Sequence, residues 1–336
     1  MSPVRGSRRE PAESPLWAAP RVLFLAALVS AFFLIFQATA VGGALRRQEA
    51  TRHVEAGRAI DTRLFEPGAC VEYQPTAGDR HLTVFLDAGH GGLDPGGVGT
   101  DVAGNTVYEA NETLPVELDA MKLLRAKGFT VVVSRTGNET VSRPEADDLD
   151  GNLFSVQGVH DDVAARDECA DMSRADLLLG IYFDAGGSSY DAGGVTGYDT
   201  ARPFSAQSEK FAALVQNDVM FVMDAEGWGI PDLGVVDDSV LGGPALSTEA
   251  ADYGHLLLLG PPVTGWFTTP STMPGALIEP LFITDPTEAG LAESASGQQV
   301  IAGGISLAIE QYFAPSAPGG QNSEKGTPLR HPPRST

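Results

Sequence analysis

A single histidine lies in a glycine-rich loop directly after an apolar run of the chain. The stretch from Leu82 to Gly99 reads LTVFLDAGHGGLDPGGVG, in which Leu82–Leu86 has strand character and His90 sits among glycines. Glycines permit a tight turn with positive φ and leave little bulk around the imidazole. A histidine at the exit of a buried strand is well placed to bind a metal ion. The alternative is an ordinary loop histidine beside a turn, and the local pattern favours neither.

Three carboxylates occupy comparable positions near expected strand ends. Glu109 precedes a helical segment, Asp184 follows an apolar run, and Glu279 closes the run GALIE. One histidine, one carboxylate and a further ligand would suit catalytic zinc, which keeps a fourth position for water. A separate glutamate near that water can act as general base and then protonate a leaving amine. Each carboxylate also has a plain explanation: Glu109 suits a helix N-terminus, and Glu279 suits a surface ion pair.

Apolar runs alternate with amphipathic segments along the chain. The strands and helices that they predict must position the histidine and the carboxylates described above. We expect strands at 82–86, 129–134, 176–183, 255–259 and 275–279, and helices at 114–127, 161–173, 205–224 and 288–313. The alternation predicts an α/β domain with a twisted, mostly parallel sheet and helices on both faces. Ligands of such sheets bind beyond the carboxyl ends of the strands. The stretches 137–160 and 225–253 are longer than ordinary connections and are expected to be functional loops or surface insertions.

The N-terminal segments are expected to direct the chain across a membrane. Residues 1–21 form a basic leader, and Val22–Leu45 carries no charged residue. This order fits a signal peptide that is cleaved after Ala38-Thr39-Ala40, or an uncleaved transmembrane anchor. Either one places the remainder outside the cytoplasm, as a secreted or membrane-anchored protein. The expected organisation continues with a connector at 46–65, one domain at 66–314 and a disordered tail at 315–336.

Charge and cysteine content narrow the class of protein further. The 336 residues include 22 Lys and Arg against 44 Asp and Glu, a net charge of −22. So acidic a chain argues against nucleic acid as a partner. Cys70 and Cys169 are its two cysteines. Export to an oxidising compartment favours a disulfide between them, and the alternative is two unpaired, half-buried thiols.

Four segments occur in the order, and nearly the spacing, of a known family. They read FLDAGHGGLDPGGVG, YEANETLPVELDAMKLLRAKGFTVVVSRT, ADLLLGIYFDAG and MPGALIEPLFITDPTEAGLAES. On these segments the chain resembles the zinc-dependent N-acetylmuramoyl-L-alanine amidases, which cut the amide between muramic acid and the peptide stem of peptidoglycan. The resemblance covers about residues 82–313 and is weak through 137–160 and 185–255. It implies a bacterial cell-wall hydrolase with peptidoglycan as substrate and one zinc ion as cofactor.

Carried over residue by residue, the resemblance implies that His90 and Glu109 are zinc ligands and that Glu279 is the catalytic glutamate. The third ligand departs from the family. The family usually has a histidine there, in a pattern like S-I-H-x-N, whereas this chain reads Gly180-Ile181-Tyr182-Phe183-Asp184. Tyr182 therefore stands in the histidine's place. A second departure is Pro280-Leu281, where the family commonly has a small, glycine-bearing turn.

Three outcomes for the third ligand remain open. Tyr182 can bind zinc only as a phenolate, and its ordinary pKa is about 10. Asp184 shares the same side of the strand, so its carboxylate offers a substitute. His255 is a more distant candidate for the same substitution, and it is expected at the wrong end of the sheet. In the third outcome the ligand is lost and zinc is weakly bound or absent.

Two hypotheses of different classes follow. The first is an exported zinc amidase acting on peptidoglycan, anchored in the membrane through residues 22–45 or secreted. The second is a catalytically degenerate peptidoglycan-binding or regulatory protein on the amidase fold. Retention of His90, Glu109 and Glu279 favours the first, whereas Tyr182 and Pro280 favour the second. Hydrolysis of another amide by the same fold is a third possibility.

Overall fold

A computed structural model of the chain describes residues 57–189, 191–241 and 246–315. The expected leader, the membrane or signal segment and nearly all of the expected tail lie outside these residues. Among the helices of the described ranges, none is both long enough and apolar enough to cross a bilayer. The described residues belong to one compact unit, which begins at Gly57.

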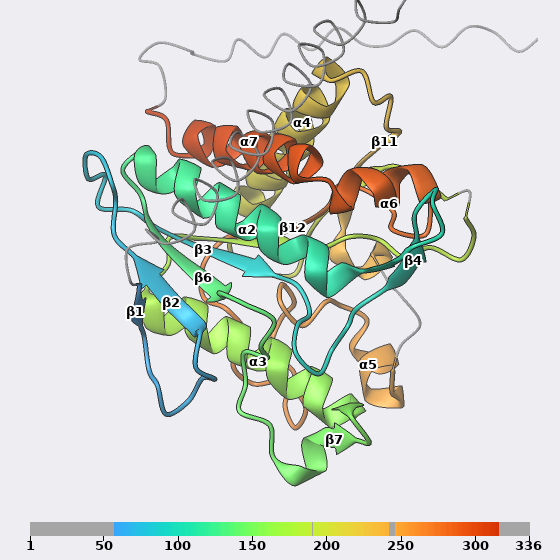
Figure 1. Cartoon of the computed structure of the whole chain (residues 1–336). Coiled ribbons are helices and arrows are strands. Elements are labelled where there is room, and N and C mark those ends of the chain that lie inside the picture. The colour runs from blue at the N-terminus through green and yellow to red at the C-terminus, as the bar shows by residue number, and fades with distance from the viewer. Residues whose placement is uncertain (1–56, 190, 242–245, 316–336) are drawn as a thin grey trace, which may run out of the picture. The chain divides into compact units, whose positions relative to one another are not determined.

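An eight-stranded sheet forms the centre of this unit (Figure 1). Its strands are β1 (Arg58–Ala59), β2 (Ala69–Tyr73), β3 (Thr83–Ala88), β6 (Thr130–Arg135), β9 (Leu177–Ile181), β10 (Gly194–Tyr198), β11 (Asp232–Asp237) and β12 (Gly275–Glu279). They lie in the order β1-β2-β6-β3-β9-β12-β10-β11. The four central strands β6, β3, β9 and β12 are parallel, while β2 and β10 run antiparallel to their central neighbours. The expected mostly parallel sheet is confirmed.

Helices cover both faces of the sheet, as predicted. They are α2 (Glu109–Ala126), α3 (Val156–Ser173), α4 (Ser205–Ala225), α5 (Thr248–Tyr253), α6 (Pro286–Glu293) and α7 (Ala295–Tyr312). Successive strand residues point to opposite faces. Val84 and Leu86 accordingly join one buried cluster with α2, α4 and α7, whereas Phe85 joins a second cluster with Cys169 and Ala170 of α3. Figure 1 shows α2, α4 and α7 on one side of the sheet and α3 on the other.

Short elements lie in the segment between β3 and α2 and in the two long interruptions of the pattern. They are β4 (Val98–Thr100), β5 (Thr106–Tyr108), the 3₁₀ turn η2 (Ala146–Asp148), β7 (Leu149–Asp150), β8 (Leu153–Phe154) and the 3₁₀ turn η3 (Asp238–Val240). The first two pair as one hairpin and β7 with β8 as another. Neither hairpin belongs to the central sheet.

Two of the expected elements are wrong. The stretch 255–259 forms no strand; Leu258 and Leu259 are apolar because they are buried in the α3-side cluster. The expected helix 288–313 is two helices, since Ser294 interrupts it and accepts a hydrogen bond from the Gly297 backbone N–H (2.9 Å) as the N-cap of α7. A serine hydroxyl at that position satisfies one of the helix's free N–H groups.

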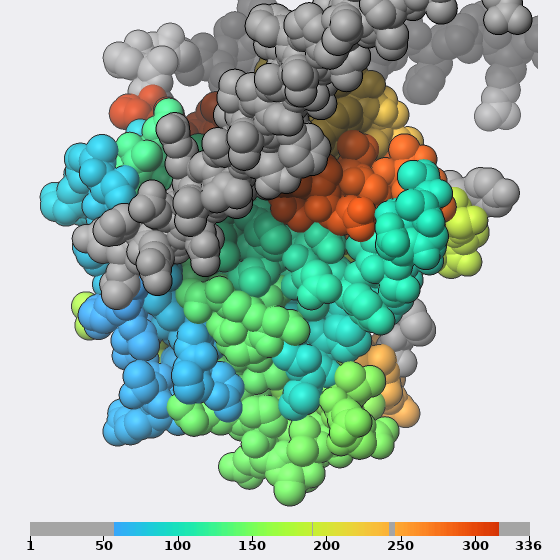
Figure 2. All heavy atoms as spheres, viewed as in Figure 1, coloured from blue at the N-terminus to red at the C-terminus, as the bar shows by residue number. Residues whose placement is uncertain are grey.

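A disulfide joins Cys70 of β2 to Cys169 of α3, with the Cα atoms 5.7 Å apart. Both cysteines are completely buried. The described part of the expected connector 46–65 also belongs to the folded unit, because Arg58–Ala59 forms β1 and Phe65 is buried in the core. Figure 2 shows this blue N-terminal segment packed beside green segments from the middle of the chain.

Candidate functional site

His90 lies in the loop after β3 with its backbone in the left-handed region, at φ +61°. This conformation is uncommon for a residue with a side chain and persists only where the surroundings hold it. Gly91 and Asp94 exchange backbone hydrogen bonds of 2.8 and 3.0 Å that close the loop. Arg166 of α3 donates a hydrogen bond from Nη2 to the His90 carbonyl (2.8 Å). The loop is therefore fixed from within and from the helix below it.

Both ring nitrogens of His90 face carboxylates. Nδ1 lies 2.7 Å from Asp94 Oδ2, and Nε2 lies 3.0 Å from Glu109 Oε2. Burial alone would lower the pKa of His90, but Glu109 and Asp94 outweigh it and raise the pKa to about 10. A carboxylate on one ring nitrogen fixes the ring and directs the other nitrogen outward, as is common for metal-binding histidines. Asp94 was not singled out from the sequence, although it stands four residues after His90.

Glu109 is the first residue of α2 and is buried. Its Oε1 accepts a hydrogen bond from the Phe183 backbone N–H (2.9 Å), and its Oε2 accepts one from Gly97 (2.8 Å). Gly96 has positive φ, and a Cβ there would lie 2.7 Å from the His90 ring and 2.8 Å from Glu109 Oε2. Only glycine fits this position, which lets His90 and Glu109 converge.

Tyr182, directly after β9, lies beside His90 but its hydroxyl is directed elsewhere. The two rings meet edge to face with centroids 5.3 Å apart. The hydroxyl donates to Asp87 Oδ2 (3.1 Å), while Asp87 Oδ1 pairs with Arg166 Nη1 (2.6 Å). Burial, and next the Asp87 charge, raise the pKa of Tyr182 well above its ordinary value. The neutral phenol is thus favoured, and a phenolate would be costly here.

Asp184 and Glu279 belong to the same edge of the sheet. Glu279 ends β12, and Asp184 forms an isolated bridge with Phe282 just beyond it. Burial, followed by Asp184 and Glu109, raises the pKa of Glu279 to about 8, with His90 opposing. Burial and then Glu109 also raise the pKa of Asp184. The four sequence-predicted residues His90, Glu109, Asp184 and Glu279 therefore form one electrostatically coupled group.

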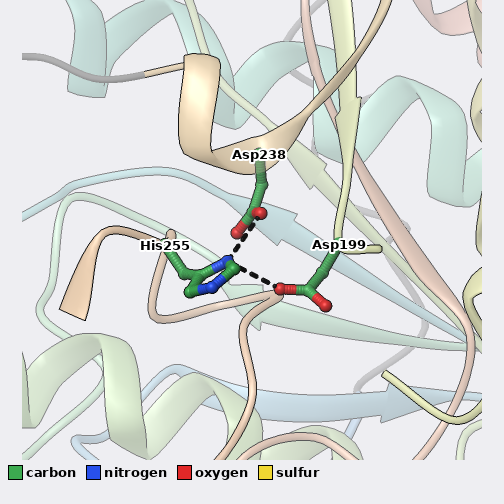
Figure 3. A group of neighbouring side chains, drawn as sticks. All are labelled: Asp199, Asp238 and His255. Atoms are coloured by element: carbon green, nitrogen blue, oxygen red, sulfur yellow. Dashed lines mark hydrogen bonds and ion pairs between the residues drawn. The ribbon is translucent and has the colours of Figure 1, made fainter. Parts of the chain in front are cut away.

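The donors at this edge fit a metal ion in part. His90 Nε2 and Glu109 Oε2 are 3.0 Å apart and suit two positions of a zinc site. Within the described residues, the one set of three metal-type side chains with ligand atoms within 4.8 Å of one another lies elsewhere, at Asp199, Asp238 and His255 (Figure 3). Among the described residues, no third His, Cys, Asp or Glu ligand atom therefore completes a compact set with His90 and Glu109.

Two cavities in the described residues lie in different regions of the unit. A cavity of about 290 Å³ is lined by residues of β4, by Gly186–Ser189, and by Thr284 and Pro286. Gly97 and Ala185 are chain neighbours of two lining residues, and a Cβ on Gly97 would lie 2.5 Å from Ala185 and 3.3 Å from Glu109 Oε2. The larger cavity, about 760 Å³, is bordered by His160, His255 and Trp266 and by none of the sequence-predicted site residues except His255.

Comparison with known proteins assigns this scaffold. A family model described as N-acetylmuramoyl-L-alanine amidase (Amidase_3) matches residues 84–311. The chain belongs to this amidase family. The match begins in β3, just before His90, and ends within α7, so it includes all four residues of the coupled group.

Individual relatives agree with the family assignment. The germination-specific N-acetylmuramoyl-L-alanine amidase of Bacillus subtilis is 26% identical over 245 residues, 73% of this chain and 81% of that protein. N-acetylmuramoyl-L-alanine amidase AmiC of Escherichia coli is 26% identical over 250 residues, 71% of this chain and 54% of that protein. The CwlD amidase of Clostridioides difficile, solved in complex with the GerS lipoprotein, has a TM-score of 0.51 at 22% identity, covering 69% of this chain and 98% of CwlD. The last likeness concerns the fold.

Proposed function

We propose that this chain hydrolyses the amide between muramic acid and L-alanine in peptidoglycan, outside the cytoplasm. The observation that carries the proposal is the convergence of His90 Nε2 and Glu109 Oε2, 3.0 Å apart, beside Glu279 at the carboxyl edge of the amidase-family sheet. Water would add across the amide, giving a carboxylate on the muramic lactyl group and a free L-alanine amine. The uncharged segment 22–45, outside the described residues, is proposed to export or anchor the chain.

Zinc is the proposed cofactor, and the donor set supports it in part. His90 and Glu109 would hold it, with Asp94 fixing the imidazole. Zinc, when bound, lowers the pKa of a bound water and polarises a carbonyl. Asp184 is the better candidate for the third donor, since the Tyr182 hydroxyl is already bonded to Asp87. A site made of one histidine and two carboxylates would bind zinc more weakly than the family's usual ligands, in which the third is a histidine.

Glu279 is proposed to move the proton. In the metal-free chain its pKa is raised to about 8, and a carboxyl group whose pKa lies near the working pH can both take and give a proton. It would receive the proton of the attacking water and deliver it to the leaving amine.

A second candidate function rests on Tyr182. Tyr182 stands where the family usually has a third histidine, and its hydroxyl is already bonded to Asp87. The chain would then bind peptidoglycan without cutting it, or regulate a protein that does. Pro280 after Glu279 agrees with this alternative.

The test measures new amino termini. The purified full chain, supplied with zinc, is incubated with peptidoglycan, and free L-alanine amines and soluble stem peptides are measured. We expect release by the wild type, loss in Glu279→Gln, and retention in Glu168→Gln, an exposed glutamate on α3. Binding without release by the wild type, with release gained in Tyr182→His, would establish the second candidate.

A further inference from the structure

Asp199, Asp238 and His255 come together from three separate segments (Figure 3). Asp199 follows β10, Asp238 follows β11, and His255 lies shortly after α5. His255 Nδ1 is 2.9 Å from Asp199 Oδ2 and 3.0 Å from Asp238 Oδ1. The two aspartates are almost fully buried, at 2% and 1% exposure.

This cluster is separate from the proposed amidase site. Because β10 runs antiparallel to β12, Val195 pairs with Glu279 and Tyr198 lies toward the opposite end of β12. Asp199 is four residues past Val195, about 13 Å along the strand from the level of Glu279. The cluster therefore belongs to the other end of these two strands.

Each aspartate has one oxygen committed to the backbone and one aimed at the imidazole. Asp199 Oδ1 accepts hydrogen bonds from the N–H groups of Ala201 (2.7 Å) and Arg202 (2.9 Å). Asp238 Oδ2 accepts one from Leu256 (2.8 Å). These bonds fix both carboxylates with their remaining oxygens directed at His255 Nδ1.

One proton cannot serve both of those oxygens. A ring nitrogen carries at most one hydrogen, and the hydrogen bond from Nδ1 is made with Asp238 Oδ1. Asp199 Oδ2, although buried and only 2.9 Å away, has no hydrogen-bond partner. A buried carboxylate oxygen without a partner is costly. It marks a position that a cation would satisfy.

We propose that His255 Nδ1, Asp199 Oδ2 and Asp238 Oδ1 bind a divalent transition-metal cation, with zinc as the first choice. One imidazole with two carboxylates suits such an ion. Donors about 2 Å from a tetrahedral zinc lie about 3.3 Å apart, so the two separations from His255 Nδ1, 2.9 and 3.0 Å, need to widen by only a few tenths of an ångström. Two carboxylates, a neutral imidazole and the ion also balance in charge.

The ion has an access route and a structural role. Asp238 and His255 line the cavity of about 760 Å³, which gives a cation a path to the three donors and room for a water as fourth ligand. Bound there, the ion ties the ends of β10 and β11 to the segment that follows α5. It holds one wall of the cavity in place.

The test uses the metal-stripped full chain and Zn²⁺ alone. Bound zinc per chain is measured by elemental analysis in a His90→Ala background, which removes the other proposed site. We expect one equivalent in His90→Ala, none after adding Asp199→Asn, and one after adding Asp252→Asn, an exposed aspartate of α5. Circular dichroism checks that every variant folds.

A second measurement covers the case in which Asp199→Asn does not fold. X-ray absorption of zinc-loaded His90→Ala is expected to show one imidazole with oxygen donors and no second imidazole. Zinc is also expected to raise the melting temperature of that protein. No bound zinc in His90→Ala, equal zinc with and without Asp199→Asn, or two imidazoles at the metal would overturn the proposal and leave a shared proton as the occupant.

Discussion

Among the described residues, two histidines each meet two carboxylates, and the arrangements differ. At His90 the carboxylates lie on different ring nitrogens, Asp94 on Nδ1 and Glu109 on Nε2. At His255 both lie on Nδ1. In the first arrangement Asp94 fixes the His90 ring, and Nε2 is left with Glu109 at the carboxyl edge of the sheet. The second makes three donors converge on a point and leaves a fourth position toward the cavity of about 760 Å³.

The largest expected effect is the loss of activity when Glu279, the proposed proton carrier at the His90 site, is replaced. Glu279→Gln keeps size and shape but cannot move a proton, so we expect peptidoglycan amide hydrolysis to fall about 10²- to 10⁴-fold. Release of L-alanine amines measures it, and thermal unfolding checks the fold. Activity within a few-fold of wild type would remove Glu279 from the mechanism.

Changing the carboxylate behind His90 should have a smaller effect. Asp94→Asn replaces the charged partner of Nδ1, and we expect zinc affinity at the His90 site to fall about 10- to 100-fold. Competition with a zinc chelator measures it, with Asp150→Asn as a control for exposed acidic charge. Unchanged zinc affinity would show that the contact between Asp94 and His90 Nδ1 does not support metal binding.

The third-donor question can be sharpened with a pair of variants. We expect Asp184→Asn to weaken zinc binding more than Tyr182→Phe does. Tyr182→Phe should instead destabilise the fold by about 1.5–3 kcal/mol, the typical contribution of a hydrogen bond to a charged group. Chelator competition and urea unfolding separate the two effects. A larger loss of zinc in Tyr182→Phe would make the phenol the donor.

The smallest effect concerns the pH dependence of stability in the metal-free chain. The pKa of Glu279 is raised to about 8, so between its ordinary value and 8 the folded state binds more protons than the unfolded state. Its contribution to stability is present at low pH and is lost as pH rises through that window. We expect Glu279→Gln to flatten this decline in urea unfolding from pH 5 to 8. An unchanged slope would contradict the raised pKa.

The sequence predicted the parallel core well because each strand there is a short apolar run. It missed β10 and β11, whose residues include glycines and aspartates and whose place depends on pairing with distant strands. The strand expected at 255–259 failed for the converse reason, since its leucines fill the core without pairing. Apolarity reports burial more reliably than it reports strand pairing.

The two sites differed in the same way. His90, Glu109 and Glu279 could be proposed from the sequence because they lie in segments that resemble the amidase family. Asp199, Asp238 and His255 are far apart in the sequence and meet only because β10 reverses direction and the segment after α5 returns to it. Arg166, which fixes the His90 carbonyl and Asp87, also escaped notice because its partners lie in another element.

The disulfide between β2 and α3 has a consequence for when the protein becomes competent. It anchors the helix that carries Arg166, and Arg166 in turn holds the His90 loop in its left-handed conformation. Loss of a native disulfide typically costs about 2–5 kcal/mol. A chain still in a reducing compartment would lack that brace. For the proposed exported amidase, the His90 loop would therefore be fully held only after the chain reaches an oxidising compartment.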